Sequence, residues 1–370
     1  MKKLFGILLA VVMMFSVVGV LAACNGETIE IAVVTDVGQL NDGGFNQGTY
    51  EGAKAYAEAN GKTYQYYQPK GGNKATDADR IQAMNDAIKD GAKVIVTPGF
   101  LQEAAIRDVA GKNPEVKFIF IDGYPVTAEK GGTEVLKNVA GISFKEQESG
   151  FFAGYAAVKE GFTKLGGTFG GGGSNPACNR FANGYVLGAT AAAEEMKKAV
   201  EMKISFKFGE TFSASPELKS QIEGWYTTGT EVVFSCGGSM LESVAAAADA
   251  KNGKIIGVDT DQSGFNKNII TSAVKGLANS VKWALGEFYA GNWDKIGGTG
   301  SQLGAADDAT GLPTTKDSWR MTTFTVEQYN ALFAKVKSGE IKINISEYDD
   351  TLTWVEKLTK EGVITVTLEK

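Results

Sequence analysis

Residues 29–46, with the sequence IEIAVVTDVGQLNDGGFN, contain the pattern that decides the fold. A β-branched apolar run ends in Thr35 and Asp36, and a polar loop with two glycines follows. A helix is predicted directly after this loop, over 45–59. A strand, a loop and a helix in this order are typical of a parallel sheet whose strands are connected by helices.

The alternation of strand and helix continues along the chain. The expected strands of the first series are KTYQYYQ, KVIVT and VKFIFID, with helices over 75–91, closed by Gly91, and over 101–109. A second series begins near Gly141. Its expected strands are KLGGTF, KISFKF, EVVFSC and KIIGVD, and its helices cover 146–160, 176 to about 200, and segments that begin at Pro216 and Leu241. With 370 residues, of which 43% are hydrophobic, two such series predict two α/β lobes, each a parallel sheet flanked by helices.

The first residues predict export from the cytoplasm. Lys2 and Lys3 precede an apolar run over 4–23, which ends in small residues directly before Cys24. This arrangement is that of a secretory signal, and the Cys resembles the lipidated residue of bacterial lipoproteins. We therefore assign residues 1–23 to a signal peptide and residues 24–28 to a lipidated Cys24 with a short tether, on the extracytoplasmic face of the cell membrane. The alternatives are an ordinary signal peptide with a chance cysteine, or a retained membrane anchor.

Composition excludes several classes of function. The formal charge is −6, and loss of Lys2 and Lys3 with the signal, from 37 to 35 basic against 43 acidic residues, makes it −8. Nucleic-acid binding needs a basic surface and is not expected. The absence of histidine excludes histidine bases and histidine metal sites. TFGGGGSN lacks the Gly-Lys-Ser/Thr ending of a phosphate-binding loop, so no cofactor and no metal are predicted.

Two further cysteines, Cys178 and Cys236, leave two interpretations open. Outside the cytoplasm they could form one disulfide. Two cysteines in so long a chain make no disulfide framework, however, and each fits the role of a small buried apolar residue. We favour the unpaired form.

Polar and aromatic residues follow the expected strands of both series. Asp36 and Asp122 end strands of the first series, while Phe212, Gly237 and Asp259 follow strands of the second. Ligands of open parallel sheets bind beyond the carboxyl ends of the strands. Two sheets that face each other would place all these residues around one cleft, so we predict a ligand site between the lobes.

The first loop places an aromatic ring among polar side chains. Asn41, Asp42 and Asn46 surround Phe45, and Phe212 occupies a similar polar loop in the second series. Rings offered from opposite lobes would stack on the two faces of a planar ligand. The alternative is structural: Asn41 or Asp42 caps the next helix, and Phe45 is a hydrophobic staple.

The segment IGVDTDQ brings Asp259 and Asp261 to a strand end, and Lys275 follows in TSAVK. A buried carboxylate with a lysine beside it binds a cis-diol through charge-assisted hydrogen bonds. A plain ion pair at the rim of the cleft is the alternative. A carboxylate pair also leaves hydrolysis open.

Five segments of the chain resemble the basic membrane protein family of ABC-transporter substrate-binding lipoproteins. They are AVVTDVGQLNDGGFNQGTYEG, FIFIDG, NVAGISFKEQESGFFAGYAA, IIGVDTDQS and IITSAVK. The resemblance implies a two-lobed type I periplasmic-binding fold, an ABC permease and ATPase as partners, a monomer, and no enzymatic activity. It covers residues from about 29 to beyond 290.

The resemblance also implies a purine nucleoside held between two phenylalanines, one in each lobe. The matching positions are Phe45 and Phe212, with Phe181 in CNRFANGY in reserve for the second ring. The other matching positions are Asp36 for the base, Asp259 and Lys275 for the ribose, and Gly237 for backbone close to the sugar. The family commonly has Asp-Lys-Ser-Phe-Asn where this chain has DGGFN, so the identity of the nucleoside stays open.

On this interpretation, residues 29–142 form the N-terminal lobe, completed by about 262–295. Residues 143–261 form the C-terminal lobe, completed by about 296–370. Three rival functions remain: binding of another sugar-like ligand, hydrolysis of a nucleoside by Asp36, Asp259 and Asp261, and a surface adhesin or antigen without a transport role.

Overall fold

The stretch at 29–46 folds as its pattern predicts. The computed structural model describes residues 28–345 and 352–370. Strand β1 (Ile31–Val34) leads through a loop into helix α1 (Phe45–Ala59). All four residues of β1 are buried, because helices cover both faces of the sheet. Alternate side chains point to opposite faces, so Ile31 and Val33 pack with α1 while Ala32 and Val34 pack with α2 (Asp77–Lys89).

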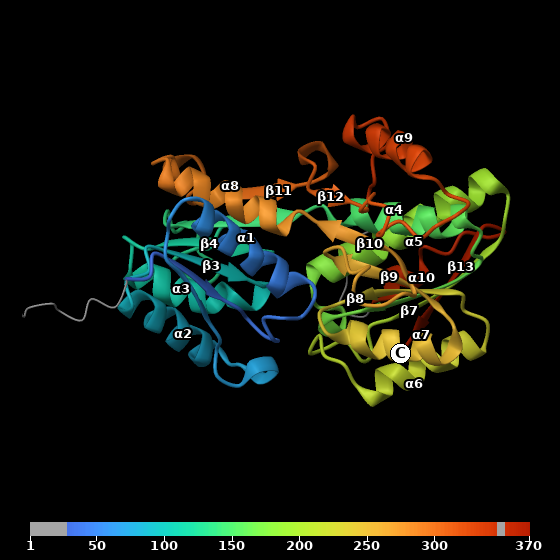
Figure 1. Ribbon diagram of the computed structural model, residues 1–370, viewed down its shortest axis with the longest axis horizontal. Coiled ribbons are helices and arrows are strands. Elements are labelled where there is room, and N and C mark those ends of the chain that lie inside the picture. Colours follow the sequence, from blue (N-terminus) through green and yellow to red (C-terminus); the bar gives the residue numbers. More distant parts are fainter. Residues whose placement is uncertain (1–27, 346–351) are drawn as a thin grey trace, which may run out of the picture.

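The first lobe is built on a six-stranded sheet with the order β11-β5-β4-β3-β1-β2, in which all pairings are parallel. Helices α1 and α8 (Leu277–Tyr289) cover one face, and α2 and α3 (Glu103–Lys112) cover the other (Figure 1). The remaining strands are β2 (Tyr64–Tyr67), β3 (Val94–Pro98), β4 (Lys117–Ile121), β5 (Val139–Phe144) and β11 (Gly300–Leu303).

The second lobe contains a seven-stranded sheet with the order β12-β10-β9-β8-β6-β7-β13. Only β12 runs antiparallel to its neighbour among these pairings. Its strands are β6 (Lys164–Phe169), β7 (Val200–Ser205), β8 (Val232–Cys236), β9 (Lys254–Asp259), β10 (Ile269–Lys275), β12 (Thr310–Gly311) and β13 (Ile364–Glu369).

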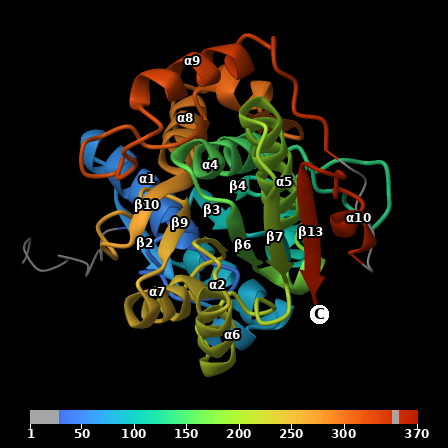
Figure 2. The ribbon, with the colours of Figure 1, turned by 90° about the vertical axis from the view of Figure 1, so that its right-hand side faces the viewer.

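Helices cover both faces of the second sheet as well. On one face lie α4 (Glu146–Glu160) and α5 (Pro176–Met196), and on the other α6 (Pro216–Thr227) and α7 (Met240–Lys251). Figure 2 shows β13 at the edge beside β7, with α9 (Val326–Lys337) and α10 (Thr353–Glu356) on the outside of this lobe. The predicted fold class, two α/β lobes with parallel sheets flanked by helices, is confirmed.

Within the described residues, the chain passes between the lobes three times. These crossings lead from β5 to α4, from β10 to α8, and from β11 to β12. The expected lobe boundaries differ from the two sheets at three strands: β5 lies in the first sheet up to Phe144, β10 lies in the second sheet, and β11 lies in the first. The hydrophobic pattern of a strand shows that it is buried but does not show which neighbour it pairs with.

Two helix ends show how single residues set the boundaries. Helix α2 ends at Lys89, and Gly91 takes a positive φ of 105°, as expected of a terminating glycine. Helix α5 was expected to reach about residue 200 but ends at Met196, because Lys197 adopts a left-handed conformation with φ of 53°. The following strand therefore begins at Val200, earlier than the expected KISFKF.

Within residues 28–345 and 352–370, no helix is both long and apolar enough to cross a membrane. The expected signal peptide and Cys24 lie outside the described residues.

Helices α4 and α5 lie unusually close together, and glycines make this possible. A side-chain carbon at Gly154 would lie 2.0 Å from the carbonyl oxygen of Tyr185, and one at Gly188 would lie 1.9 Å from that of Phe151. Gly150 and Gly184 are similarly restricted, at 2.3 and 2.1 Å from backbone oxygens. The contact therefore needs a glycine at each of these points, and it holds α4 in place directly after the first crossing.

We expect Gly154→Ala to lower the free energy of unfolding by about 2 kcal/mol, because a methyl group forced against a backbone oxygen overpacks the core. Urea denaturation would measure the change. The matched control is Gly224→Ala in α6, where a side-chain carbon meets nothing within 4 Å. That variant should gain about 0.5 to 1 kcal/mol from the better helix propensity of alanine. Equal effects of the two substitutions would contradict this account of the α4–α5 contact.

Candidate functional site

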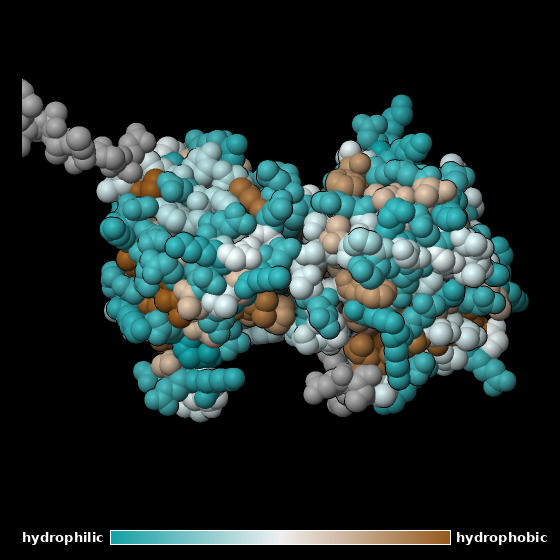
Figure 3. Space-filling model, turned by 90° about the horizontal axis from the view of Figure 1, so that it is seen from below, coloured by the Kyte–Doolittle hydropathy of each residue, from teal (hydrophilic) through white to brown (hydrophobic). Residues whose placement is uncertain are grey.

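The carboxyl ends of the parallel strands meet at a cavity of about 280 Å³ between the lobes. Figure 3, seen from below, shows the surface hollowed into a narrow waist between them. All eleven residues that the sequence predicted for a ligand site line this cavity: Asp36, Asn41, Asp42, Phe45, Asn46, Asp122, Phe181, Phe212, Gly237, Asp259 and Lys275. The two sheets therefore bring together side chains that are more than 200 positions apart in the chain.

Asp42 shapes the first loop by capping α1. Its carboxylate accepts hydrogen bonds from the backbone N–H groups of Gly44 at 2.8 Å, Asn46 at 3.0 Å and Gln47 at 3.2 Å. Burial raises the pKa of Asp42, and these N–H donors oppose the rise. Asp42 therefore caps the start of α1, as the structural alternative predicted, and it also lines the cavity.

Phe45 is the first residue of α1, and its ring lies beside Lys275 of the second lobe. Its ring is partly buried, and the Lys275 ammonium lies 4.6 Å from the ring centroid. Asn46 beside it donates from Nδ2 to the carbonyl oxygen of Val37 at 2.9 Å, which ties the loop to the start of the helix. Oδ1 of Asn46 is buried without a hydrogen-bond partner. An acceptor of this kind is costly to leave unpaired and is available to a donor in the cavity.

Asp36 lies two residues after β1 as a buried carboxyl group. Its Oδ1 accepts from the N–H of Val37 at 2.6 Å. Burial is the largest influence on this group and raises its pKa to about 7. Gly99, at the end of β3, makes room for it: a side-chain carbon there would lie 1.9 Å from Oδ2 of Asp36. At neutral pH this carboxyl group is therefore suited both to donate and to accept a hydrogen bond.

Lys275 is buried among three carboxylates. Its ammonium lies 2.7 Å from Asp122 Oδ2, 3.4 Å from Asp259 Oδ1 and 3.6 Å from Glu146 Oε1. Burial favours the neutral amine, but the three carboxylates outweigh it and raise the pKa of Lys275. Burial also raises the pKa of Asp259 to about 6 despite the attraction of Lys275. Arg180 pairs with Glu146, so Asp122 and Asp259 share the single Lys275 ammonium and the cluster keeps an excess of hydrogen-bond acceptors.

Three residues of the cavity wall adopt left-handed backbone conformations that side chains rarely take. The φ angles are 59° for Asp122, 57° for Phe212 and 66° for Asp259. Such conformations persist only where the surrounding structure holds them, and they concentrate at functional sites. Each lies in a strand end or loop at the cleft, which turns its side chain into the cavity.

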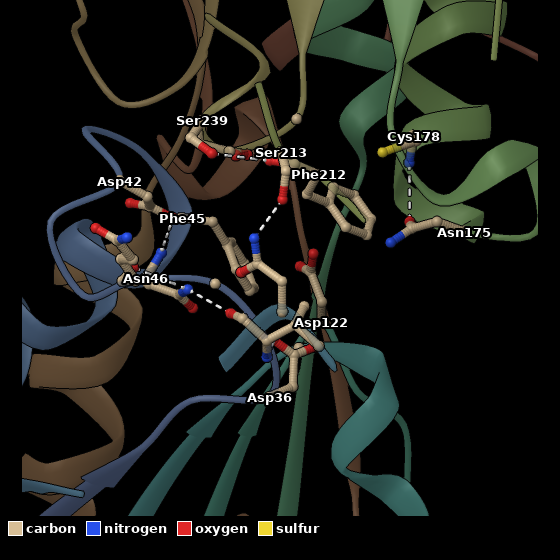
Figure 4. A pocket seen from close by; sticks show the side chains of 18 of the residues that line it. Asp36, Asp42, Phe45, Asn46, Asp122, Asn175, Cys178, Phe212, Ser213 and Ser239 are labelled. Atoms are coloured by element: carbon tan, nitrogen blue, oxygen red, sulfur yellow. Dashed lines mark hydrogen bonds between the residues drawn. The ribbon is translucent and has the colours of Figure 1, made fainter. Parts of the chain in front are cut away.

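The glycines of the second lobe form a floor under Phe212. A side-chain carbon would lie 2.3 Å from the Phe212 ring if built on Gly170, and 3.1 Å from it if built on Gly237. The family resemblance implied that Gly237 lies close to the sugar of a ligand. In the structure Gly237 lines the cavity, and both glycines make room for the Phe212 ring. Figure 4 shows Phe45 and Phe212 extending into the same space from different lobes.

Phe181 contributes to the wall in a different way. It is only 1% exposed and packs edge-on against Phe234, with ring centroids 5.9 Å apart and an interplanar angle of 83°. The Lys275 ammonium lies 5.7 Å from its ring. Phe181 thus belongs to the core of the second lobe, and Phe212, which is less buried, is the better candidate for the second stacking ring.

Side chains join the two lobes across the cleft. Thr260 Oγ1 and Gln262 Nε2 both donate to the carbonyl oxygen of Gly43, at 2.9 and 3.0 Å. On the other side, Asn73 Nδ2 donates to Ser213 Oγ. These contacts describe a conformation in which the lobes touch around the cavity.

Several cavity residues were not singled out from the sequence. They include Asn73, Phe100, Asn175, Ser239 and Glu242. Asn175 caps α5 by accepting from the N–H of Cys178 at 3.0 Å, and the Asn-Pro pair before a long helix was a usable signal for it. Asn73 and Phe100 lie in short 3₁₀ turns, and Ser239 and Glu242 lie at the start of α7; no local pattern marks them as cavity residues.

The alternative chemistries find little support in the geometry. Asp261, which the hydrolase hypothesis requires, accepts hydrogen bonds from Ser263 and Ser318 and is not among the residues that line the cavity. Among the described residues, no group of three or more acidic or cysteine side chains is placed to hold a metal ion. Cys178 and Cys236 are free and buried, and Cys178 Sγ lies 4.0 Å from the carbonyl oxygen of Cys236.

Comparison with known proteins agrees with this geometry. Residues 29–347 match the Bmp family, described as ABC transporter substrate-binding protein PnrA-like. The chain belongs to this family. Its relatives are substrate-binding proteins of ABC transporters and not enzymes, and proteins of this class act outside the cytoplasm with a permease and an ATPase.

Individual relatives are similar over most of their length. The ABC transporter nucleoside-binding protein BmpA of Lactococcus lactis is 29% identical over 299 residues, covering 72% of this chain and 79% of the relative. The CD4+ T-cell-stimulating antigen of Listeria monocytogenes is 26% identical over 344 residues, covering 86% and 89%. A solute-binding protein of an ABC transporter system from Aeropyrum pernix superimposes with a TM-score of 0.72 at 24% identity, covering 89% of this chain and 97% of that one, and supports the fold.

The buried carboxyl group of Asp36 should make stability depend on pH. Its pKa of about 7 in the folded protein exceeds the ordinary value of 3.8, so the folded state binds the proton more tightly. Its contribution to stability is complete below pH 3.8 and is lost as the pH rises towards 7. Relative to Asp36→Asn, the wild type should lose up to about 4 kcal/mol between pH 4 and pH 8.

Urea denaturation of the ligand-free protein at several pH values would measure this difference. Asp294→Asn is the control, because Asp294 is exposed. The free energy of unfolding of the Asp294→Asn variant, relative to that of the wild type, should stay constant within about 0.5 kcal/mol, as for most surface substitutions. A constant difference between the wild type and Asp36→Asn would show that Asp36 titrates normally.

Proposed function

We propose that this protein captures a nucleoside, most specifically a purine nucleoside, in the cleft between its lobes. One observation carries the proposal: two phenylalanine rings enter one cavity from different lobes, and a carboxylate–lysine cluster lies beside them. Phe45 and Phe212 suit the two faces of a planar base. The cluster suits the hydroxyl groups of a ribose.

The sugar end of the proposed site is the Lys275 cluster. Asp122 and Asp259 each have oxygens that are not bonded to Lys275, and Oδ1 of Asp122 is buried without a hydrogen-bond partner. A cis-diol supplies two adjacent O–H donors for such acceptors, and each bond to a carboxylate is charge-assisted. The ammonium of Lys275 then serves as a donor to a hydroxyl oxygen.

The base end of the proposed site is the first loop with Asp36. The free acceptor of Asn46 and the carboxyl group of Asp36 lie on the first-lobe side, where Phe45 also begins its helix. Purine edges combine N–H donors with ring-nitrogen acceptors, and a carboxyl group with a pKa of about 7 satisfies either. The nucleoside-binding name of the Lactococcus lactis relative supports the same ligand class.

Delivery to a transporter completes the proposal. We propose that the protein is a monomer anchored through lipidated Cys24, and that its lobes close over the ligand by rotation about the three crossings. The closed form would be recognised by the permease. Domain closure around a bound solute leaves the chemistry of the ligand unchanged, which fits a binding protein.

Calorimetric titration of the chain from Asn25, after unfolding and refolding to remove any bound solute, would test the ligand. We expect saturable binding of guanosine or adenosine, weaker binding of cytidine, and little binding of ribose or free bases, because both ends of the site must be occupied. Binding of ribose as tight as that of the nucleosides would favour a sugar-binding protein. Release of free base during incubation would indicate a hydrolase, and no binding of any of these by folded protein would favour the antigen hypothesis.

Substitutions should locate the ligand in the cleft. Phe45→Ala removes one stacking surface and should weaken purine-nucleoside binding by about 2 kcal/mol, or roughly 30-fold. Asp259→Asn should weaken nucleosides far more than their 2′,3′-dideoxy forms, which lack the diol. The matched control for the ring is Phe265→Ala, because Phe265 is 50% exposed and does not line the cavity. An unchanged affinity in Phe45→Ala would place the ligand elsewhere.

A further inference from the structure

Arg180 makes contacts to both lobes although it does not line the cavity. It lies in α5 and is only 6% exposed. Its Nε donates to Oε2 of Glu146 at 2.5 Å, and its Nη1 donates to the hydroxyl oxygen of Tyr124 at 3.1 Å. Glu146 belongs to the second lobe, whereas Tyr124 follows β4 of the first. The guanidinium group thus ties the lobes together near the crossings.

The second oxygen of Glu146 extends this chain of contacts to the cavity. Oε1 lies 3.6 Å from the Lys275 ammonium and has no hydrogen-bond partner of its own. Lys275 in turn pairs with Asp122 of the first lobe at 2.7 Å. The chain of contacts therefore runs Tyr124–Arg180–Glu146–Lys275–Asp122. It begins and ends in the first lobe and passes through the second.

The members of this chain sit where the lobes are joined. Glu146 is the first residue of α4, directly after the first crossing, and Lys275 is the last residue of β10, directly before the second. A rotation of the lobes about the crossings therefore changes the Tyr124–Arg180 contact and the Lys275–Asp122 contact together. The two interlobe contacts are mechanically coupled because the second lobe moves as one packed body.

Stability alone does not explain the pair of Arg180 and Glu146. Both charges are buried, and a buried ion pair is generally no more stabilising than apolar residues of the same size. Burial raises the pKa of Glu146, while Arg180 and Lys275 oppose the rise and favour its ionised form. An ionised Glu146 attracts both the Arg180 guanidinium and the Lys275 ammonium, so Arg180 influences where that ammonium lies.

We propose that Tyr124, Arg180 and Glu146 form a closure latch that positions Lys275 when the lobes close. These three are positioning residues, since the cavity wall does not include them. The latch rests on the proposed function in one respect: the group it positions is the one assigned to the ribose. Opening the lobes breaks the Tyr124–Arg180 bond, and closing them restores it with Lys275 in its binding position.

Tyr124→Phe tests the latch by removing a single hydroxyl group from a side chain that is 49% exposed, so folding should be unaffected. Stopped-flow measurement with guanosine and adenosine should show a dissociation rate raised roughly fivefold to tenfold, as for the net loss of one ordinary, partly exposed hydrogen bond. The association rate should stay within about twofold, because the bond forms only on closure. The control is Tyr289→Phe, whose hydroxyl has no hydrogen-bond partner.

A ligand-independent measurement separates the latch from the ligand assignment. Spin labels on Asn85→Cys in α2 and Ser220→Cys in α6, both exposed positions, report the distance between the lobes in ligand-free protein. Tyr124→Phe should shift the distribution to longer distances, whereas Tyr289→Phe should not. If the wild type binds no nucleoside, the ligand assignment fails, and this distribution still decides the latch. An unchanged distribution, or an unchanged dissociation rate in a protein that binds nucleoside, overturns it.

Discussion

The rest of the cleft depends on the burial of Lys275 among carboxylates from both lobes. Asp122 comes from the first lobe, and Asp259 and Glu146 come from the second. The Lys275 ammonium and the Arg180 guanidinium, which pairs with Glu146, face three buried acids, and unpaired buried charge is costly. The elevated pKa of Asp259, about 6, expresses that cost. A ligand that donates hydrogen bonds would relieve it, which is consistent with the proposed nucleoside.

Two residues of this cluster have left-handed backbone conformations, which non-glycine residues rarely adopt. Asp122 and Asp259 both take positive φ at strand ends, and the strands behind them are buried on both faces. Rigid strands hold these two carboxylates, which means that little of the site has to be ordered when a ligand arrives. Movement is then expected in the relative position of the two lobes, which are joined by three crossings within the described residues.

Glycine serves two separate purposes in the second lobe. In α4 and α5 it lets two helices touch, which fixes the segment after the first crossing. In Gly170 and Gly237 it makes room for the ring of Phe212. Glycine thus contributes both to the helix contact beside the first crossing and to the wall of the cavity. Neither purpose involves phosphate, in agreement with the missing lysine in TFGGGGSN.

The sequence by itself determined the order of strands and helices and the acidic and aromatic residues at the strand ends. Asp36 lies just after, and Asp259 at the end of, a mostly apolar strand, and this pattern is local, so it can be recognised without the fold. Tertiary structure alone decided that β10 joins the second sheet and β11 the first, and that Arg180 reaches Tyr124. A charged residue in a helix is usually exposed, and nothing near Arg180 in the sequence indicates that it is buried. Pairing and burial depend on contacts between distant segments, which no pattern within one segment contains.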